Sequence, residues 1–317
     1  MFALSRLWTA GAIAGFLGGG RIVGDAGRAV RAVAPLEAAE PGALAFCSAT
    51  EVAAALQQIG AAKTDIVVVA RESLALESAA DDRTLLMVVN PRRAFIQFSV
   101  HAFPADAIAD GVSPLASIAP SARLGAAVSI GPFAVVEDGA EIGAGCRIGP
   151  HVQIARSVHI GPRAQIQGRS TIGMIGTANE RESDGRFVSL PHLASVRIGA
   201  DCQIGPGTTI ARGTLRDTMI EDGCIIGAQV NIGHNCRVGR HCFIGTGAIL
   251  TGSSSLAEQC WLGPGTMIAN RVRVGRGTTI AIGSVVVRDC GEDLYLAGNP
   301  ARALPHTTRF NQQGDKH

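Results

Sequence analysis

The chain has few aromatic and few charged residues. Aromatics make up 4% and charged residues 17% of its 317 positions, and the net charge is only +2. A charge this small does not indicate a nucleic-acid partner, because such proteins normally carry a basic patch or stripe. Hydrophobic residues still make up 47% of the chain, which excludes a disordered protein. With 40 glycines and so few aromatics, we expect a core of small aliphatic side chains joined by many tight turns.

Long hydrophobic runs are also missing. The apolar N-terminal stretch, residues 7–19, is too short to span a bilayer. It also has neither the basic start nor the small-residue cleavage site of a secretory signal. We therefore expect a short packed helix there, no membrane span and a cytoplasmic protein. In that compartment the eight cysteines should stay reduced.

From residue 118 onward an aliphatic residue recurs at every sixth position. The runs extend from Ile118 to Ile172, from Ile198 to Ile210 and from Ile220 to Val286, and a small residue usually sits four places after the aliphatic one. This hexapeptide repeat is typical of a parallel β-helix, in which six residues form a short strand and a turn and three such units form one coil. Coils stack at the strand spacing of about 4.8 Å. Each residue should therefore lie over the residue 18 places earlier, unless an insertion intervenes.

The repeat also indicates the domain organisation. Residues 1–112 lack it and are typical of a small α/β domain, with helices expected at 50–60 and 90–98 and buried strands at 65–70 and 84–89. The β-helix is predicted at 113–290, and 291–317 is predicted to be a tail that covers the last coil. Two insertions interrupt the coils, a long excursion at 174–195 and one of four residues near 215–219. Loops as long as the first are usually functional.

The segment 231–242 contains two histidines and two cysteines, a local pattern that suggests zinc. The phase of the repeat argues against that interpretation. His234 falls at an outward position and His241 on another face of the coil, so the two should not share a metal. Seven cysteines take the inward position that favours small residues, where they behave as buried hydrophobes: Cys146, Cys202, Cys224, Cys236, Cys242, Cys260 and Cys290. We expect no metal site.

Residues 191–239 resemble the UDP-3-O-acylglucosamine N-acyltransferases. The similarity is carried by the "RG-L-DT-I" run, the "QV-IGHN" core and the long loop before "VRIG". Residues 35–48 and 88–98 resemble the uridine-binding domain of that family. The resemblance implies a left-handed β-helix homotrimer with active sites between subunits. It also implies that a fatty acyl group moves from acyl carrier protein to the 2-amino group of a UDP-sugar, in lipid A synthesis.

The same resemblance implies site residues. The base is expected at His234 and an oxyanion-stabilising glycine at Gly252, which is 18 places further on and thus one coil away. A histidine suits this task, because the attacking amine must lose a proton near neutral pH. Phe46, from the uracil clamp, and Asn235 are assigned to substrate binding. No tightly bound cofactor is expected; the donor is a carrier-protein phosphopantetheine thioester or an acyl-CoA, and Asn270 and Arg271 are assigned to it.

The sequence departs from the family at four positions. The clamp's Tyr and Asn fall on Val52 and Ala49, a second family histidine falls on Arg271, and a family Asp falls on Ala211. The ending "LAGNPARAL" resembles CoA-dependent sugar acetyltransferases. Two alternatives therefore stay open: a CoA-dependent acetyl- or short-acyl transferase acting on another nucleotide amino sugar, and a non-catalytic scaffold that binds sugar nucleotides.

Arginines gather in the last coils and allow two interpretations. They form either a solvated basic face or a dock for the phosphates of the donor or for an acidic carrier protein; the residues are Arg271, Arg273, Arg276 and Arg288. A third class of function, a zinc enzyme similar to the γ-class carbonic anhydrases, would need three histidine ligands. No third histidine with suitable spacing accompanies His234 and His241.

Overall fold

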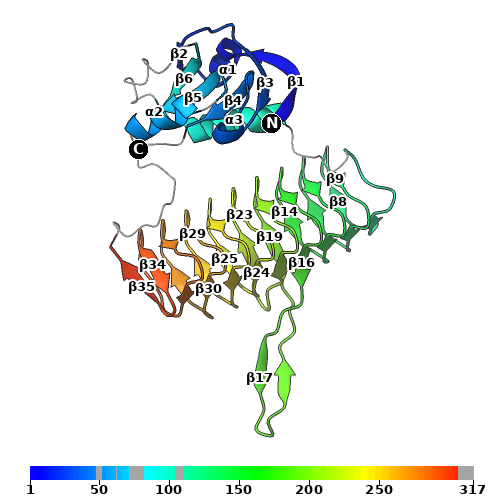
Figure 1. Ribbon diagram of the computed structural model, residues 1–317. Helices are drawn as coiled ribbons and strands as arrows, with labels where there is room; N and C mark the ends of the chain where they lie inside the picture. Colours follow the sequence, from blue (N-terminus) through cyan, green and yellow to red (C-terminus); the bar gives the residue numbers. More distant parts are fainter. Residues whose placement is uncertain (48–51, 62, 71–81, 104–109, 306–317) are drawn as a thin grey trace. The chain divides into compact units, whose positions relative to one another are not determined.

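The computed structural model describes residues 1–47, 52–61, 63–70, 82–103 and 110–305 (Figure 1). The chain forms two compact units, Met1–Ala107 and Ile108–His317. The first is an α/β unit and the second is built almost entirely of short parallel strands. In the described part of the chain, no helix is long and apolar enough to cross a membrane.

The first unit is a six-stranded sheet with helices on both faces. Its strand order is β1 (Phe2–Thr9), β3 (Ala29–Val33), β4 (Ala43–Phe46), β5 (Ile66–Ala70), β6 (Thr84–Val88) and β2 (Arg21–Val23). The strands β3 to β6 run parallel, and both edge strands are antiparallel to their neighbours. Helices α1 (Ala10–Phe16) and α3 (Pro91–Ala102) share one core with the sheet. Helix α2 (Val52–Ala61) packs in another, near the 3₁₀ turn Leu36–Ala38.

Among the described residues, the predicted helices and strands of this unit are confirmed, with one difference; residues 50–51 of the helix predicted at 50–60 lie outside the described part. Asn90 caps α3 as expected, since its Oδ1 accepts from Arg93 N at 2.8 Å. The N-terminal helix is shorter than residues 7–19, because β1 extends to Thr9 and Thr9 Oγ1 then accepts from Ala12 N to begin α1. Residues 7–9 therefore belong to the sheet.

The second unit is the predicted parallel β-helix. Three sheets contribute one strand per coil. The first sheet contains β7 (Ser117–Ile118), β10 (Val135–Val136), β13 (Gln153–Ile154), β16 (Thr171–Met174), β21 (Thr209–Ala211), β24 (Asn231–Ile232), β27 (Ile249–Leu250), β30 (Met267–Ile268) and β33 (Val285–Val286). The second contains β8 (Arg123–Leu124), β11 (Glu141–Ile142), β14 (His159–Ile160), β19 (Val196–Ile198), β22 (Thr218–Ile220), β25 (Arg237–Val238), β28 (Ser255–Leu256) and β31 (Arg273–Val274).

The third sheet also carries the end of the described chain. It contains β9 (Ser129–Ile130), β12 (Arg147–Ile148), β15 (Gln165–Ile166), β20 (Gln203–Ile204), β23 (Ile225–Ile226), β26 (Phe243–Ile244), β29 (Trp261–Leu262), β32 (Thr279–Ile280), β34 (Tyr295–Gly298) and β35 (Ala301–Leu304). Strand β34 adds to β32 in parallel, and β35 then turns back antiparallel. Strand β34 thus adds one strand to the stack, and β35 covers the outer edge of β34.

The register between coils agrees with the repeat. Ile232 pairs with Leu250, 18 positions later, whereas Ile198 pairs with Ile220 across the four-residue insertion. The repeated aliphatic residues are buried in one continuous core, and the inward cysteines belong to it or pack against it. The structure confirms this role: the six cysteines from Cys146 to Cys260 are buried, Cys290 is half-buried, and all are free thiols.

Both insertions leave the stack at the same place, where the first sheet turns into the second. We call this the insertion edge; from the first insertion onward its turns are residues 175–195, 212–217, 233–236, 251–254, 269–272 and 287–290. The long excursion carries a hairpin of β17 (Asn179–Arg181) and β18 (Phe187–Ser189), which projects away from the coils (Figure 1). The insertion edge therefore combines the irregular segments with His234, Gly252, Asn270 and Arg271.

Candidate active site

His234 and Gly252 occupy consecutive turns of the insertion edge and are in direct contact. The backbone links the turns, since Ser253 N donates to the His234 carbonyl oxygen at 2.8 Å. A Cβ placed on Gly252 would lie 2.6 Å from His234 Nε2 and 2.7 Å from Cε1. Only glycine leaves room for the imidazole in this position, because real Cβ contacts are never so short. The sequence spacing of 18 therefore produces a contact through Nε2, the nitrogen that faces the next coil.

The surroundings of His234 favour its neutral form. The residue is half-buried, and its Nδ1 is buried without a hydrogen-bond partner among the described residues. Burial, and secondarily the charge of His192, lower the pKa of His234 below its ordinary value of 6.5. A neutral imidazole at pH 7 can accept a proton, as a general base must.

Gly252 offers a backbone donor beside this base. Its carbonyl oxygen accepts from Asn270 Nδ2 at 2.6 Å and from Arg271 N at 3.2 Å. Its own N–H has no acceptor in the part of the chain that the structure describes. An unpaired N–H held in a fixed direction is the type of group that stabilises a developing oxyanion. The predicted pair of base and oxyanion donor is therefore brought together.

His192, near the end of the long excursion, also lies at this site. Its ring contacts that of His234 edge-to-face, with centroids 5.4 Å apart and an interplanar angle of 84°. The repeat does not predict His192 at this site, because the spacing of 18 does not apply across the excursion. The only sequence signal is its position in "PHLASVRIG", inside the segment that carries the resemblance.

Asn235 lies beside His234 but faces the short insertion. Its Oδ1 accepts from Thr214 N at 2.8 Å, its Nδ2 donates to Thr214 Oγ1 at 2.9 Å, and its own N–H donates to Thr218 Oγ1. It adopts a left-handed backbone with φ of 61°, which asparagine tolerates well. Through these contacts Asn235 holds the turn that contains the short insertion, residues 212–217, next to His234. The assignment of Asn235 to substrate binding stays a prediction.

Asn270 and Arg271 form the turn after Gly252. Both are exposed, and Asn270 holds the Gly252 peptide through the bond described above. The predicted arginine cluster is divided by the structure. Arg271 and Arg288 lie on the insertion edge, whereas Arg273 lies on β31 and Arg276 on the next edge, where it pairs with Glu292 at 3.7 Å. Only two of the four arginines can therefore act together beside the site.

Phe46, the candidate for uracil contact, ends β4 in the first unit. It is half-buried and packs against Phe95 of α3, with ring centroids 5.0 Å apart. Of the two positions where the sequence departs from the clamp, Ala49 lies outside the described residues. Val52 begins α2, and its side chain is likewise outside the described part.

The two histidines of segment 231–242 are separated by the fold. His234 lies on the insertion edge and His241 on the edge between the second and third sheets, where it packs over Gly223. Among the described residues, no group of three histidine, cysteine or acidic side chains is placed to hold a metal ion.

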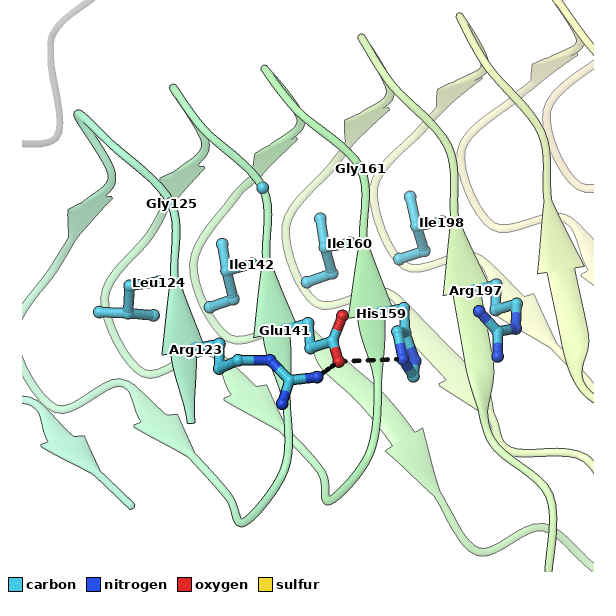
Figure 2. A pocket seen from close by; sticks show the side chains of 11 residues that line it. Arg123, Leu124, Gly125, Glu141, Ile142, His159, Ile160, Gly161, Arg197 and Ile198 are labelled. Atoms are coloured by element: carbon cyan, nitrogen blue, oxygen red, sulfur yellow. Dashed lines mark ion pairs between the residues drawn. The ribbon is translucent and has the colours of Figure 1, made fainter. Parts of the chain in front are cut away.

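A separate hollow of about 460 Å³ lies on the second sheet, over β8, β11, β14 and β19. Figure 2 shows its charged side chains in a row, with Glu141 between Arg123 and His159 and paired with both. Arg197, at the end of the row, instead pairs with Asp217 at 2.7 Å. None of the six predicted site residues lines this hollow. Its charges compensate one another along the strands, which indicates a structural ladder.

Comparison with known proteins places these features in a family. The model of bacterial transferase hexapeptide repeats matches residues 121–156 and 217–252, a range that includes His234 and Gly252. The UDP-3-O-acylglucosamine N-acyltransferase of Herminiimonas arsenicoxydans is 34% identical over 88% of this chain and 85% of its own length. The enzyme of the same name from Delftia acidovorans is 33% identical over 91% of this chain and 85% of its own length.

Solved structures share the β-helix. The UDP-N-acetylglucosamine acyltransferase of Campylobacter jejuni is 26% identical with a TM-score of 0.54, covering 64% of this chain and 79% of its own. The Francisella novicida UDP-N-acetylglucosamine acyltransferase, at 24% identity and a TM-score of 0.57, covers 61% of this chain and 70% of its own; that likeness concerns the fold alone.

Proposed function

Because the chain belongs to the UDP-3-O-acylglucosamine N-acyltransferase family of acyltransferases, we propose that it transfers an acyl group from a thioester donor to the amino group of a UDP-linked amino sugar, with His234 as general base. The donor is an acyl carrier protein or CoA thioester, and the product enters lipid A synthesis. The observation that carries the proposal is the contact between His234 Nε2 and Gly252, on the edge that also carries both insertions.

The chemistry follows from the groups present. The sugar amine attacks the thioester carbonyl while His234 Nε2 takes the amine proton, so that a C–N bond forms and negative charge moves to the carbonyl oxygen. The Gly252 N–H, which has no acceptor among the described residues, is suited to bond that oxygen. The C–S bond then breaks, and the imidazolium returns its proton to the leaving thiolate. The lowered pKa of His234 keeps the base neutral before each turnover.

In this proposal the donor binds along the insertion edge beyond Gly252. The next turn carries the exposed residues Asn270 and Arg271, and the turn after it carries the exposed Arg288. Guanidinium groups suit the phosphates of phosphopantetheine or CoA. The nucleotide of the acceptor is assigned to the first unit through Phe46. We also propose a homotrimer with the site between subunits, supported by the apolar side chains that the projecting hairpin exposes.

A matrix of donors and acceptors tests the proposal. Acyl-carrier-protein and CoA thioesters of several chain lengths would be paired with UDP- and dTDP-linked amino sugars, with products identified by mass. We expect the highest kcat/KM for a long-chain carrier-protein thioester and a UDP-linked 2-amino sugar. His234→Ala should lower kcat by at least about 100-fold with the assembly intact. Near-normal turnover by His234→Ala would contradict the assignment of the base.

The C-terminal hairpin favours a second candidate function, a short-acyl transferase. The end of the described chain forms the β34–β35 hairpin from the segment that resembles CoA-dependent sugar acetyltransferases. In the same matrix, a preference for acetyl-CoA over carrier-protein donors would favour a short-acyl transferase on another nucleotide amino sugar. No product with any pair, combined with binding of UDP-sugars, would favour the non-catalytic scaffold.

A further inference from the structure

His192 carries two buried nitrogens that have no evident task. Neither Nδ1 nor Nε2 has a hydrogen-bond partner within the described part of the chain, and His234 Nδ1 is in the same condition. Three unpaired polar atoms thus lie in two rings that touch. Burying such groups without partners is costly, so their arrangement calls for a functional explanation.

The separation of the rings allows a hydrogen bond between them. Their centroids are 5.4 Å apart, and the rings stand nearly perpendicular at 84°. A hydrogen bond between the rings would require a rotation of His192 that brings one of its nitrogens to about 3 Å from His234 Nδ1. Nε2 of His234 meanwhile stays against Gly252.

Small residues make the space for this pair. A Cβ on Gly176 would lie 3.1 Å from His192 Nε2, 3.3 Å from Ala211 Cβ and 3.7 Å from His234 Cδ2. Ala211 contributes no polar side-chain atom here. The neighbouring charged groups form hydrogen bonds elsewhere. Asp217 accepts from Arg197 and from Ser195 N, and Arg212 donates to the carbonyl oxygens of Ala194 and Arg156.

The backbone that carries His192 is firmly held. Leu193 N and Ala194 N both donate to the Thr214 carbonyl oxygen, at 2.8 and 3.0 Å. Ser195 is held by two hydrogen bonds: its backbone N donates to Asp217 Oδ1 at 2.8 Å, and its Oγ donates to the Ser157 carbonyl oxygen at 2.6 Å. The long excursion therefore ends in an anchored turn that presents His192 to the base.

We propose that His192 is the positioning residue of His234, accepting a hydrogen bond from Nδ1–H so that Nε2 stays unprotonated and directed at Gly252. A histidine base is normally oriented by a third group bonded to its other nitrogen. In this chain the third group is an imidazole supplied by the excursion. The inference rests on the proposed function, because it assigns a role within that same site.

Three variants separate positioning from packing. His192→Leu fills the space without an acceptor, His192→Gln restores an acceptor oxygen, and His241→Leu is the matched control on another edge. We expect His192→Leu to lower kcat by about 100-fold with little change in KM. His192→Gln should recover most of that loss, and His241→Leu should act like the unmodified enzyme. Unchanged melting temperature and assembly would show that the variants fold.

The tautomer of His234 gives a second readout that does not depend on turnover. Nuclear magnetic resonance of ¹⁵N-histidine-labelled protein should show the Nδ1–H form in the unmodified protein and in His192→Gln, and a mixture of forms in His192→Leu. Equal activity of His192→Leu and the unmodified enzyme would overturn the proposal, as would equal losses in Leu and Gln variants. If His234→Ala is inactive while His192→Leu is not, only this inference fails; an active His234→Ala removes the proposed base itself.

Discussion

His234 Nε2 would lie 2.6 Å from a Cβ at position 252, so the imidazole occupies the space that any side chain on Gly252 would need. This contact joins a group able to take a proton to a backbone N–H able to stabilise an oxyanion. The two residues lie on successive coils, 18 positions apart, and the stack keeps them in register. The β-helix thus acts as a rigid frame for the site.

Gly252→Ala should therefore damage catalysis more than folding. The methyl group displaces the His234 ring, and misplacing a catalytic group by about 1 Å can cost about 100-fold in rate. We expect that loss in kcat, measured in steady-state assays with the preferred pair of substrates. Gly291→Ala is the matched control, because its Cβ would meet only Leu294 Cδ1 at 3.8 Å. Equal rates for Gly252→Ala and Gly291→Ala would show that the contact is not needed.

The lowered pKa of His234 predicts the pH dependence of activity. The base must be neutral, so kcat/KM should fall only as pH drops through a value below 6.5 and should be level at neutral pH. The stability of the fold should change with pH in the same direction. Because the unfolded chain binds the proton more readily, the free energy of unfolding should decrease as pH falls from about 6.5 through the lower folded pKa. His234→Gln removes this titration. The melting temperatures of the unmodified protein and of His234→Gln, compared from pH 7.5 to 5, should therefore differ least at the upper end of this range, where His234 is neutral. An acid limb above pH 7 would contradict this assignment.

The cysteine thiols should react poorly with thiol reagents in the folded protein. Burial raises the pKa of Cys236, and the pKa of Cys242 is raised to about 12: its interaction with Cys224 acts to lower it, but the interaction with Cys260 and burial together outweigh that effect. The interaction with Cys242 lowers the pKa of Cys260, but this thiol is buried in the core, where a reagent does not reach it. Thiols with raised pKa values stay protonated near pH 8 and react poorly. A colorimetric thiol reagent should label at most Cys290, which is half-buried, and all eight after denaturation. Cys290→Ser should remove the native signal; several reactive thiols in the folded protein would contradict core packing.

Much of this architecture could be predicted because it depends on local period. The six-residue repeat determines which residues face inward, and the spacing of 18 places Gly252 on His234. His192 could not be found in this way, because the excursion displaces its coil: Ile160 pairs with Ile198, 38 positions later. The arginine cluster was predicted as a unit, yet Arg271, Arg273 and Arg276 fall on a turn, a strand and the next turn. Proximity in sequence does not imply a shared face in a structure that turns every six residues.

In the first unit, prediction depended on side-chain composition. The strands β5 and β6 consist largely of Val, Leu and Ile and were expected from their sequences. Strands β3 and β4 were not, since they contain Ala29, Ala32, Ala43 and Ala45, and alanine is depleted in strands. Pairing with the neighbouring strands supplies what local propensity lacks.

Arg271 should contribute to donor binding without taking part in the chemistry. It is exposed on the insertion edge, one turn beyond Gly252. Arg271→Ala should raise the donor KM by about threefold to tenfold at low salt and leave kcat nearly unchanged, and the difference should shrink as salt screens the charge. Arg276→Ala, whose guanidinium pairs with Glu292 on another edge, is the control. A fall in kcat with unchanged donor KM would instead place Arg271 at the reacting atoms.

The projecting hairpin should carry part of the proposed trimer interface. Phe187 and Val188, on β18 of the hairpin, expose 60% and 51% of their surface in the single chain, and Leu193, at the base of the excursion, exposes 71%. Exposed apolar side chains that gather on soluble proteins usually mark contacts with partners. Replacing both Phe187 and Val188 with Asp should bury charge at that contact and shift the mass seen by light scattering from trimer to monomer. Glu180→Gln, a polar change on the same hairpin, should leave the mass unchanged. Because His192 lies at the base of the excursion, loss of assembly should also lower kcat. A fully active trimer carrying both aspartates would exclude the hairpin from the interface.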